Sequence, residues 1–313
     1  MDFKGFFALQ PHQGKEFAYE NALKQAGYHQ SGYLRAPVKF ALFDLDNGPF
    51  GQGWSESLKG YAERGIPLFL YPHGARPMVQ YDGILKVHPD VRCMFTHAAG
   101  GVEVMRAFGF PLPVEAVGWT FCKIEPFRPS NEIKSVLFGP IHPNENGWLS
   151  QVDKEINAKT FVKIHAWCQK SGARLQVRHL HAIEENGLPR LDDVIYYRGS
   201  ANQATADIDM ADLVIGHQTF AFLAVARGKP TLMMSEETAP HSGNTDANFT
   251  FVASWEKYKD RMMYPLDVLR CRNLDKLIDK AMSSDSEIRE WRERFIGEPF
   301  NGKKFVERLE AYL

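Results

Sequence analysis

The chain has 313 residues, of which 44% are hydrophobic, enough to bury a sizeable core in about two domains. Its 37 Lys and Arg nearly cancel its 38 Asp and Glu, so the global charge does not indicate a nucleic-acid-binding or membrane-binding protein. The N-terminus lacks the features of a signal peptide, and no apolar run approaches the roughly 20 residues of a membrane span. These observations predict a cytoplasmic protein. Cys93 and Cys168 lie in apolar segments, where we expect reduced, buried thiols.

Strands and helices alternate along the first half of the chain. Short apolar runs predict the strands, Gly residues end the helices, and polar loops follow the strands. The expected strands are residues 3–9, 38–45, 66–71, 91–95 and 114–117. The expected helices are residues 15–26 and 54–64 and a segment that follows His97 and runs through Phe108. This order predicts a parallel sheet with helices on both faces.

The same pattern starts again after residues 119–132, which lack periodicity and indicate a linker. The expected strands are residues 135–138, 174–180, 193–197 and 213–215 and one that begins at Thr231; the expected helices are residues 158–170 and 201–210 and a largely helical tail over 273–313, broken at 297–302. The fold class is therefore α/β, with two Rossmann-like parallel-sheet domains facing a cleft. We predict a first domain over residues 1–125, a second over 134–285, and a helical tail over 286–313 that packs back on the first domain.

The most informative stretch is residues 211–234. A short strand ends at Gly216, and His217, Gln218 and Thr219 then open a helix that Gly228 ends. Free backbone N–H groups and the helix dipole meet beyond the carboxyl end of such a strand, where they favour an anion such as phosphate. The alternative is a crossover of the sheet that holds no ligand.

Polar residues follow the expected strands of the first half. His73 lies in a loop rich in Gly and Pro, where a neutral imidazole can take the proton of an acceptor hydroxyl; the alternative is a loop histidine bonded to backbone. Asp46 is a second candidate base, or else part of an Asx turn, and His12 in the first loop is a third. Arg76 is expected to bind a phosphate, or else to form a surface ion pair.

Basic residues gather at the strand ends of the second half. Arg178 lies inside a strand, where a buried cation needs an anionic partner: a donor diphosphate, or an internal carboxylate such as Asp192. Arg198 and His142 lie at comparable strand ends. No metal motif of the H-E-x-x-H type occurs, so we predict no metal and no cofactor. The G-x-G-x-x-G, G-K-[ST] and G-x-S-x-G motifs are also absent, which gives no support to a dehydrogenase, a kinase or the simplest kind of hydrolase.

Over roughly residues 66–235 the sequence resembles the GT-B glycosyltransferase superfamily, and within it bacterial CDP-glycerol glycerophosphotransferases most and UDP-N-acetylglucosamine 2-epimerases somewhat less. His73-Gly74, Gly139-Pro140 and the stretch from Ala211-Asp212 to Thr219 match the places of the family motifs. The resemblance implies that Gly74 lies on the acceptor or phosphate side and that Gly139 and His142 lie on the donor side.

The sequence departs from the family in the helix before Gly228-Lys229-Pro230. Many members carry there a Glu that binds the donor ribose, and this chain has Leu223. Glu236 and Glu237, after the following strand, are expected to replace it. Where the family has a turn rich in Ser or Thr, this chain has His217, Gln218 and Thr219, of which only Thr219 carries a hydroxyl.

The expected function is transfer of a sugar or polyol phosphate from a nucleotide-activated donor to an acceptor hydroxyl, with closure of the two domains about a hinge near Pro126 and Pro129. Two alternatives stay open: a nucleotide-sugar 2-epimerase, and a non-catalytic binding protein on a degenerate transferase fold, which Leu223 favours slightly. The expected partner is a nucleotide-sugar donor. An envelope polymer, a small molecule, a protein and a modified nucleic-acid base are all compatible with the sequence as acceptor.

Overall fold

The structure, a computed structural model, describes residues 5–8, 18–31, 38–44, 60–61, 63–71, 91–107, 112–141, 149, 151–179, 186–234, 264–269, 271–283 and 285–313. These residues divide into two compact units, each with its own sheet. The described parts of the first unit fall within Met1–Thr120 and Gly297–Leu313, and those of the second within Phe121–Ser242 and Met263–Ile296. The chain therefore has two α/β units, which is the fold class that the sequence predicts.

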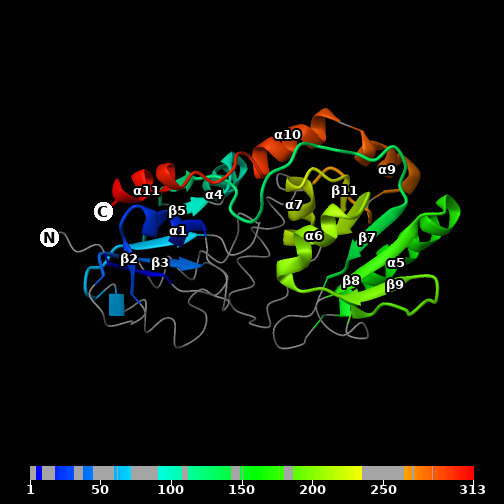
Figure 1. The fold of residues 1–313 in the computed structure, drawn as a ribbon, viewed down its shortest axis with the longest axis horizontal. Helices are drawn as coiled ribbons and strands as arrows, with labels where there is room; N and C mark the ends of the chain where they lie inside the picture. Colours follow the sequence, from blue (N-terminus) through cyan, green and yellow to red (C-terminus); the bar gives the residue numbers. More distant parts are fainter. Residues whose placement is uncertain are drawn as a thin grey trace. The chain divides into compact units, whose positions relative to one another are not determined.

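The first unit is built on a six-stranded parallel sheet with the strand order β2-β1-β3-β4-β5-β6 (Figure 1). Its strands are β1 (Gly5–Ala8), β2 (His29–Gln30), β3 (Phe40–Asp44), β4 (Leu68–Tyr71), β5 (Val91–Thr96) and β6 (Val114–Ala116). The described helices around it are α1 (Ala18–Gln25), α4 (Ala99–Ala107) and α11 (Gly302–Glu310). Strand β2 was not predicted from the sequence, because its two polar residues carry no apolar pattern.

Both faces of the first sheet are buried, because successive side chains of a strand point to opposite faces. On one face Phe69 and Phe95 stack with ring centroids 6.0 Å apart, and Phe305 of α11 meets Phe95 edge-on at 4.8 Å. Tyr19 of α1 contacts the same Phe305 ring at 5.0 Å. Met94 and Met105 belong to a separate cluster on the other face, under α4. The first unit therefore needs α11, from the far end of the chain, to complete its aromatic core.

The second unit is built on a five-stranded parallel sheet with the order β11-β10-β7-β8-β9. Its strands are β7 (Ser135–Gly139), β8 (Arg174–His179), β9 (Ile195–Arg198), β10 (Leu213–Gly216) and β11 (Thr231–Met233). The helices are α5 (Gln151–Ser171), the 3-10 turn η2 (Ala201–Gln203), α6 (Ala204–Asp209), α7 (Gln218–Ala226), α9 (Leu274–Met282) and α10 (Ser286–Phe295).

Helices cover both faces of the second sheet (Figure 1). On one face Phe138 lies 6.4 Å from Phe161 of α5, ring to ring. On the other face Leu137 packs in a cluster with Ile208 of α6 and Ala224 of α7. Helix α5 begins at Gln151, seven residues before the expected start. The prediction began too late because the first turns of the helix are mostly polar and show little apolar periodicity.

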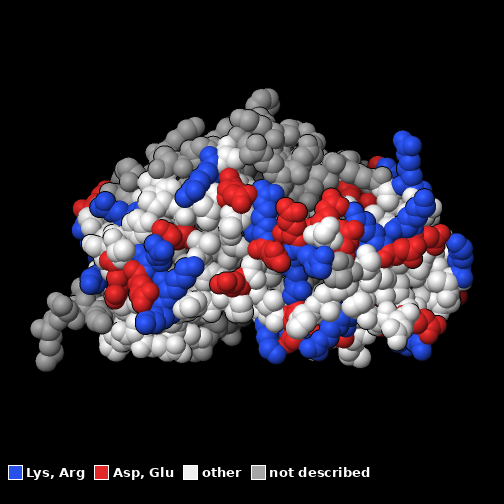
Figure 2. Space-filling view, turned by 90° about the horizontal axis from the view of Figure 1, so that it is seen from above, with Lys and Arg blue, Asp and Glu red and all other residues white. Residues whose placement is uncertain are grey.

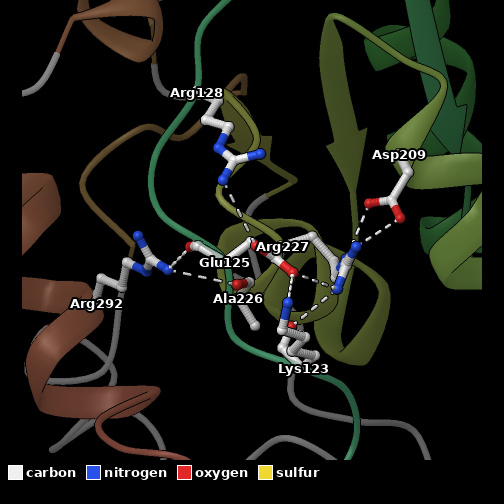
Figure 3. Close-up of polar contacts among 7 residues, drawn as sticks. All are labelled: Lys123, Glu125, Arg128, Asp209, Ala226, Arg227 and Arg292. Atoms are coloured by element: carbon white, nitrogen blue, oxygen red, sulfur yellow. Dashed lines mark hydrogen bonds and ion pairs between the residues drawn. The ribbon is translucent and has the colours of Figure 1, made fainter.

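Residues 121–130, part of the linker expected over 119–132, form no helix or strand and lie on the end of α7 within the second unit (Figure 3). The Glu125 N–H donates to Ala226 O at 2.9 Å, and the Arg128 N–H donates to Gly228 O at 2.9 Å. Of the helical tail expected over 286–313, α10 belongs to the second unit and α11 to the first.

The described surface carries charges of both signs. Figure 2 shows Lys and Arg side chains interspersed with Asp and Glu over the face that it presents. All four cysteines are free thiols, and burial raises the pKa of Cys93 and of Cys168 to about 12. Among the residues that the structure describes, no helix is long and apolar enough to cross a membrane.

Candidate functional site

The carboxyl edge of the second sheet brings together two of the predicted glycines and the start of α7. Gly139 and Gly216 are paired residues at the ends of β7 and β10. His217 follows in an extended conformation (φ −118°, ψ 143°), and Gln218 opens the helix. The first N–H groups of a helix have no partner within it and carry the positive end of the helix dipole. The structure therefore places a helix N-terminus beyond the sheet, as residues 211–234 predict.

The ring of Phe220 explains why both strands end in glycine. A Cβ atom at Gly139 would lie 2.5 Å from Phe220 Cδ1, and one at Gly216 would lie 2.7 Å from the same atom. No side chain fits at either position without moving the ring. The two glycines thus make room for Phe220, which packs the first turn of α7 against the sheet.

Arg178 lies next to the ring of Phe220, and an ion pair within the protein compensates its charge. Its side chain is 5% exposed, and its Nε donates to Asp207 Oδ2 at 2.7 Å. Its Nη2 donates to Ser200 O, and its guanidinium carbon lies 5.4 Å from the Phe220 ring centroid. The internal carboxylate is therefore Asp207 of α6, whereas Asp192 is exposed to solvent.

Arg198 and His179 are paired residues at the carboxyl ends of β9 and β8. Arg198 is exposed and His179 is buried. Gly199, directly after Arg198, donates its N–H to His179 O at 2.9 Å. Arg198 is thus the exposed arginine of this edge, while Arg178 lies beneath it.

Eight of the predicted site residues lie outside the described residues. They are His12, Asp46, His73, Gly74, Arg76, His142, Glu236 and Glu237. Their proposed roles stay predictions. Of Gln218 only the backbone is described.

Leu223 lies on the side of α7 that faces the apolar cluster of Leu137, Ile208, Val214 and Ala224. It is partly buried against these side chains. A glutamate at this position would lie beside that cluster, where a carboxylate without a partner is costly. Leucine at this position therefore has a packing role in this chain.

Several residues of the family-like motifs bind backbone at the amino end of the sheet. The Asp212 carboxylate accepts from Ser130 Oγ at 2.6 Å and from the Ser135 N–H at 2.9 Å. Lys229 Nζ donates to Asp209 O at 2.6 Å and to Ala211 O at 2.8 Å. Because Asp212 lies before β10 and the anion site would lie after it, these motif residues support the fold.

Two buried polar residues, His97 and Asn157, were not among the candidates predicted from the sequence. His97, after β5 in the first unit, is 3% exposed, and its ring lies 5.2 Å from that of Trp119. Asn157, on α5 in the second unit, is fully buried and binds the backbone of Ile141. The sequence His97-Ala-Ala-Gly-Gly101 after an apolar run could have indicated His97 as a polar strand-end residue. Asn157 is a lone asparagine within a helix, and no sequence pattern indicates its role. In the described part of the chain, no three His, Cys, Asp or Glu side chains form a group that could hold a metal ion.

No protein-family model and no curated protein sequence matches this chain. Among solved structures it is similar to MurG of Acinetobacter baumannii, with a TM-score of 0.51 and 11% identity over 98% of this chain and 99% of that one. It is also similar to the UDP-N-acetylglucosamine 2-epimerase of Rickettsia bellii, with a TM-score of 0.51 and 12% identity over 88% of this chain and 74% of that one. Together with the two parallel sheets, these similarities confirm the expected fold class, α/β with two Rossmann-like parallel-sheet units as in the GT-B fold; the expected cleft between the units stays a prediction.

Proposed function

We propose that the chain is a GT-B-type glycosyltransferase that moves a sugar, or a polyol phosphate, from a nucleotide-activated donor to an acceptor hydroxyl. The observation that carries the proposal is the place of α7. Its N-terminus opens directly beyond the paired ends of β7 and β10, where open α/β sheets bind ligands. One of the similar structures is a UDP-N-acetylglucosamine 2-epimerase, which supports a nucleotide-linked donor.

In this proposal the first turn of α7 binds the donor diphosphate. The backbone N–H groups of Gln218 and Thr219 donate to phosphate oxygens, and the helix dipole stabilises their charge. His217 and Arg198 contribute from the same edge, and Arg178 holds Phe220 and the helix start in place. Gly139 and Gly216, the last residues of β7 and β10, let α7 approach the sheet closely.

For a sugar donor, the acceptor oxygen forms a bond to the anomeric carbon while the bond from that carbon to the diphosphate oxygen breaks. The electron pair of the broken bond goes to the diphosphate, and the acceptor proton goes to a base, for which His73, Asp46 and His12 are the candidates. For a polyol phosphate, the acceptor oxygen forms a bond to the phosphorus that carries the polyol, while the bond from that phosphorus to the bridging oxygen of the diphosphate breaks. The nucleoside monophosphate leaves with the electron pair, and the acceptor proton again goes to the base. The donor site stabilises the negative charge of either leaving group.

Isothermal titration calorimetry with UDP, CDP, GDP and ADP tests the proposal, and we expect one of them to bind. Gln218→Pro removes one N–H at the first position of α7, where proline is tolerated because His217 is extended. We expect this variant to bind the nucleotide roughly tenfold more weakly.

Ser286→Pro is the matched control, because Ser286 is the first residue of α10 and the residue before it, Asp285, has a ψ of 139°, which a following proline tolerates. It should bind the nucleotide as wild type does. Absence of binding of all four nucleotides by the wild-type protein would refute the proposal. If Gln218→Pro and the wild-type protein bind the nucleotide equally well, the diphosphate does not bind at the N-terminus of α7.

A nucleotide-sugar 2-epimerase is the second candidate, because the chain matches the Rickettsia bellii epimerase with the same TM-score as MurG. The two reactions differ in their need for an acceptor. Incubating labelled donor with the protein alone separates them: an epimerase converts the donor, and a transferase leaves its sugar unchanged. The mixed charges in Figure 2 give no support to a long polyanionic acceptor on that face.

A further inference from the structure

A buried side chain on α5 joins three segments at the carboxyl edge of the second sheet. Asn157 is fully buried in the second turn of this helix. Its Oδ1 accepts from the Ile141 N–H at 2.8 Å, and its Nδ2 donates to Ile141 O at 2.8 Å and to Asn186 O at 3.0 Å. One amide thus binds the segment after β7 and the segment that follows β8 by their backbones.

Asparagine suits this position by its hydrogen-bonding groups. Its side-chain amide supplies two donors and an acceptor, and all three are used. An aspartate would accept from the Ile141 N–H but would face two carbonyl oxygens with a carboxylate. A leucine has the same size and forms no hydrogen bond. Asn157 therefore binds both the N–H and the carbonyl oxygen of Ile141.

The segment that Asn157 holds begins beside the start of α7. Ile141 comes two residues after Gly139, and Gly139 pairs with Gly216, the residue before His217. Pro140 lies between them and has no N–H to bind its surroundings. The two hydrogen bonds of Ile141 to Asn157 thus fix the backbone two residues after the end of β7, the strand that pairs with β10 at Gly139 and Gly216.

We propose that Asn157 is a positioning residue for nucleotide binding: it sets the backbone after β7 so that this segment and the start of α7 together form the diphosphate site. This inference rests on the proposed function. Asn157 itself does not touch the ligand. Its replacement should weaken nucleotide binding in protein that is still folded.

The experiment compares Asn157→Leu and Asn157→Asp with Thr160→Val. Thr160 is the matched control because it lies three residues further on α5, is equally buried, and its Oγ1 has no hydrogen-bond partner among the described residues. Two quantities are measured: the dissociation constant of the nucleoside diphosphate that wild type binds, under conditions where near-UV circular dichroism shows each variant folded, and the hydrogen-exchange rate of the Ile141 amide.

We expect both Asn157 variants to bind the nucleotide at least tenfold more weakly and Asn157→Leu to exchange the Ile141 amide faster, while Thr160→Val matches wild type in both. Wild-type affinity in folded Asn157→Leu would overturn the positioning role and leave the proposed function intact. Wild-type affinity in Asn157→Asp alone would overturn the requirement for the donated bonds. If the wild-type protein binds no nucleotide, the proposed function fails and this inference fails with it.

Discussion

Arg178 donates to Asp207 at 2.7 Å, and the two residues lie 29 positions apart in the sequence. The guanidinium carbon of Arg178 also lies 5.4 Å from the ring centroid of Phe220, so the helix that we assign to nucleotide binding packs against one partner of this ion pair. Such a pair has a testable energetic signature. Removing one partner leaves a buried charge, whereas removing both leaves none.

Asp207→Ala should therefore lower the free energy of unfolding by about 3 kcal/mol, because Arg178 remains buried without its carboxylate. The double variant Arg178→Met with Asp207→Ala should lose clearly less, since the charge is gone. Urea unfolding of both proteins measures the difference. Asp192→Ala, at an exposed carboxylate, is the control and should behave as wild type. An equal loss in the single and double variants would contradict this account of the pair.

Gly139→Ala should lower the free energy of unfolding by about 1–3 kcal/mol, because the new Cβ atom would lie 2.5 Å from Phe220 Cδ1. Adding Phe220→Leu to this variant should restore part of the loss by opening space at the ring. Thermal unfolding measures both effects. Gly60→Ala is the control, since a methyl group there meets no atom within 4 Å among the described residues. Wild-type stability in Gly139→Ala would show that the ring moves at no cost.

The hydrogen bonds of Asp212 predict a pH dependence. Burial alone would raise the pKa of this carboxyl, but hydrogen bonds from Ser130, Lys134 and Ser135 outweigh burial and hold its pKa below the ordinary value. The stabilisation is therefore present above the unfolded-state pKa of about 3.9 and is lost as the pH falls through the lower folded-state pKa.

Asp212→Asn should accordingly cost about 1–2 kcal/mol at neutral pH, and its difference from wild type should shrink below about pH 4. Urea unfolding at neutral and acid pH measures both quantities. Asp192→Asn serves again as an exposed control. A difference that stays constant down to acid pH would show that the carboxylate charge plays no part.

The contact of segment 121–130 with the end of α7 depends on Gly228, whose φ is +72°. A Cβ atom there would collide with Pro126 O, so Gly228→Ala should displace the segment and cost more than about 1 kcal/mol. Hydrogen exchange of the Glu125 and Arg128 amides, which donate to Ala226 O and Gly228 O, should become faster. Gly60→Ala should leave both rates unchanged. Slow exchange in Gly228→Ala would contradict the dependence.

Arg292→Met tests the same contact from α10. The guanidinium of Arg292 donates to Glu125 O and to Ala226 O, the last carbonyl of α7 (Figure 3). We expect faster exchange of the Glu125 amide in this variant, and no change in Arg289→Met, a substitution on the exposed side of the same helix. If the Glu125 amide exchanges at the same rate in Arg292→Met and Arg289→Met, then Arg292 does not stabilise the contact between segment 121–130 and α7.

Local signals in the sequence predict much of the fold. The strand expected at 213–215 is observed as β10, and the helix after it ends where Gly228 takes a positive φ. These features depend on apolar runs and on glycine, which act over a few residues. The polar start of α5 and the two-residue strand β2 carry no such pattern, and they form because the tertiary structure provides partners for them.

The candidate site was less accessible to the same reasoning. Gly139, Gly216 and the start of α7 follow from strand and helix boundaries. The pairing of Arg178 with Asp207 and the three bonds of Asn157 depend on which segments meet in space, and one sequence does not contain that information. Leu223 shows the converse: the resemblance marked it as a departure, and the structure explains it by packing.

The aromatic core shared by α1 and α11 has a consequence for synthesis on the ribosome. Tyr19 emerges early and its partner Phe305 emerges nearly three hundred residues later, after the strands of the second unit have been made. The second unit can therefore complete its sheet first, while the face of the first sheet that α11 covers waits for residues 297–313. Premature termination before that segment would release a chain with this aromatic face uncovered, and such a chain is expected to aggregate or to require a chaperone.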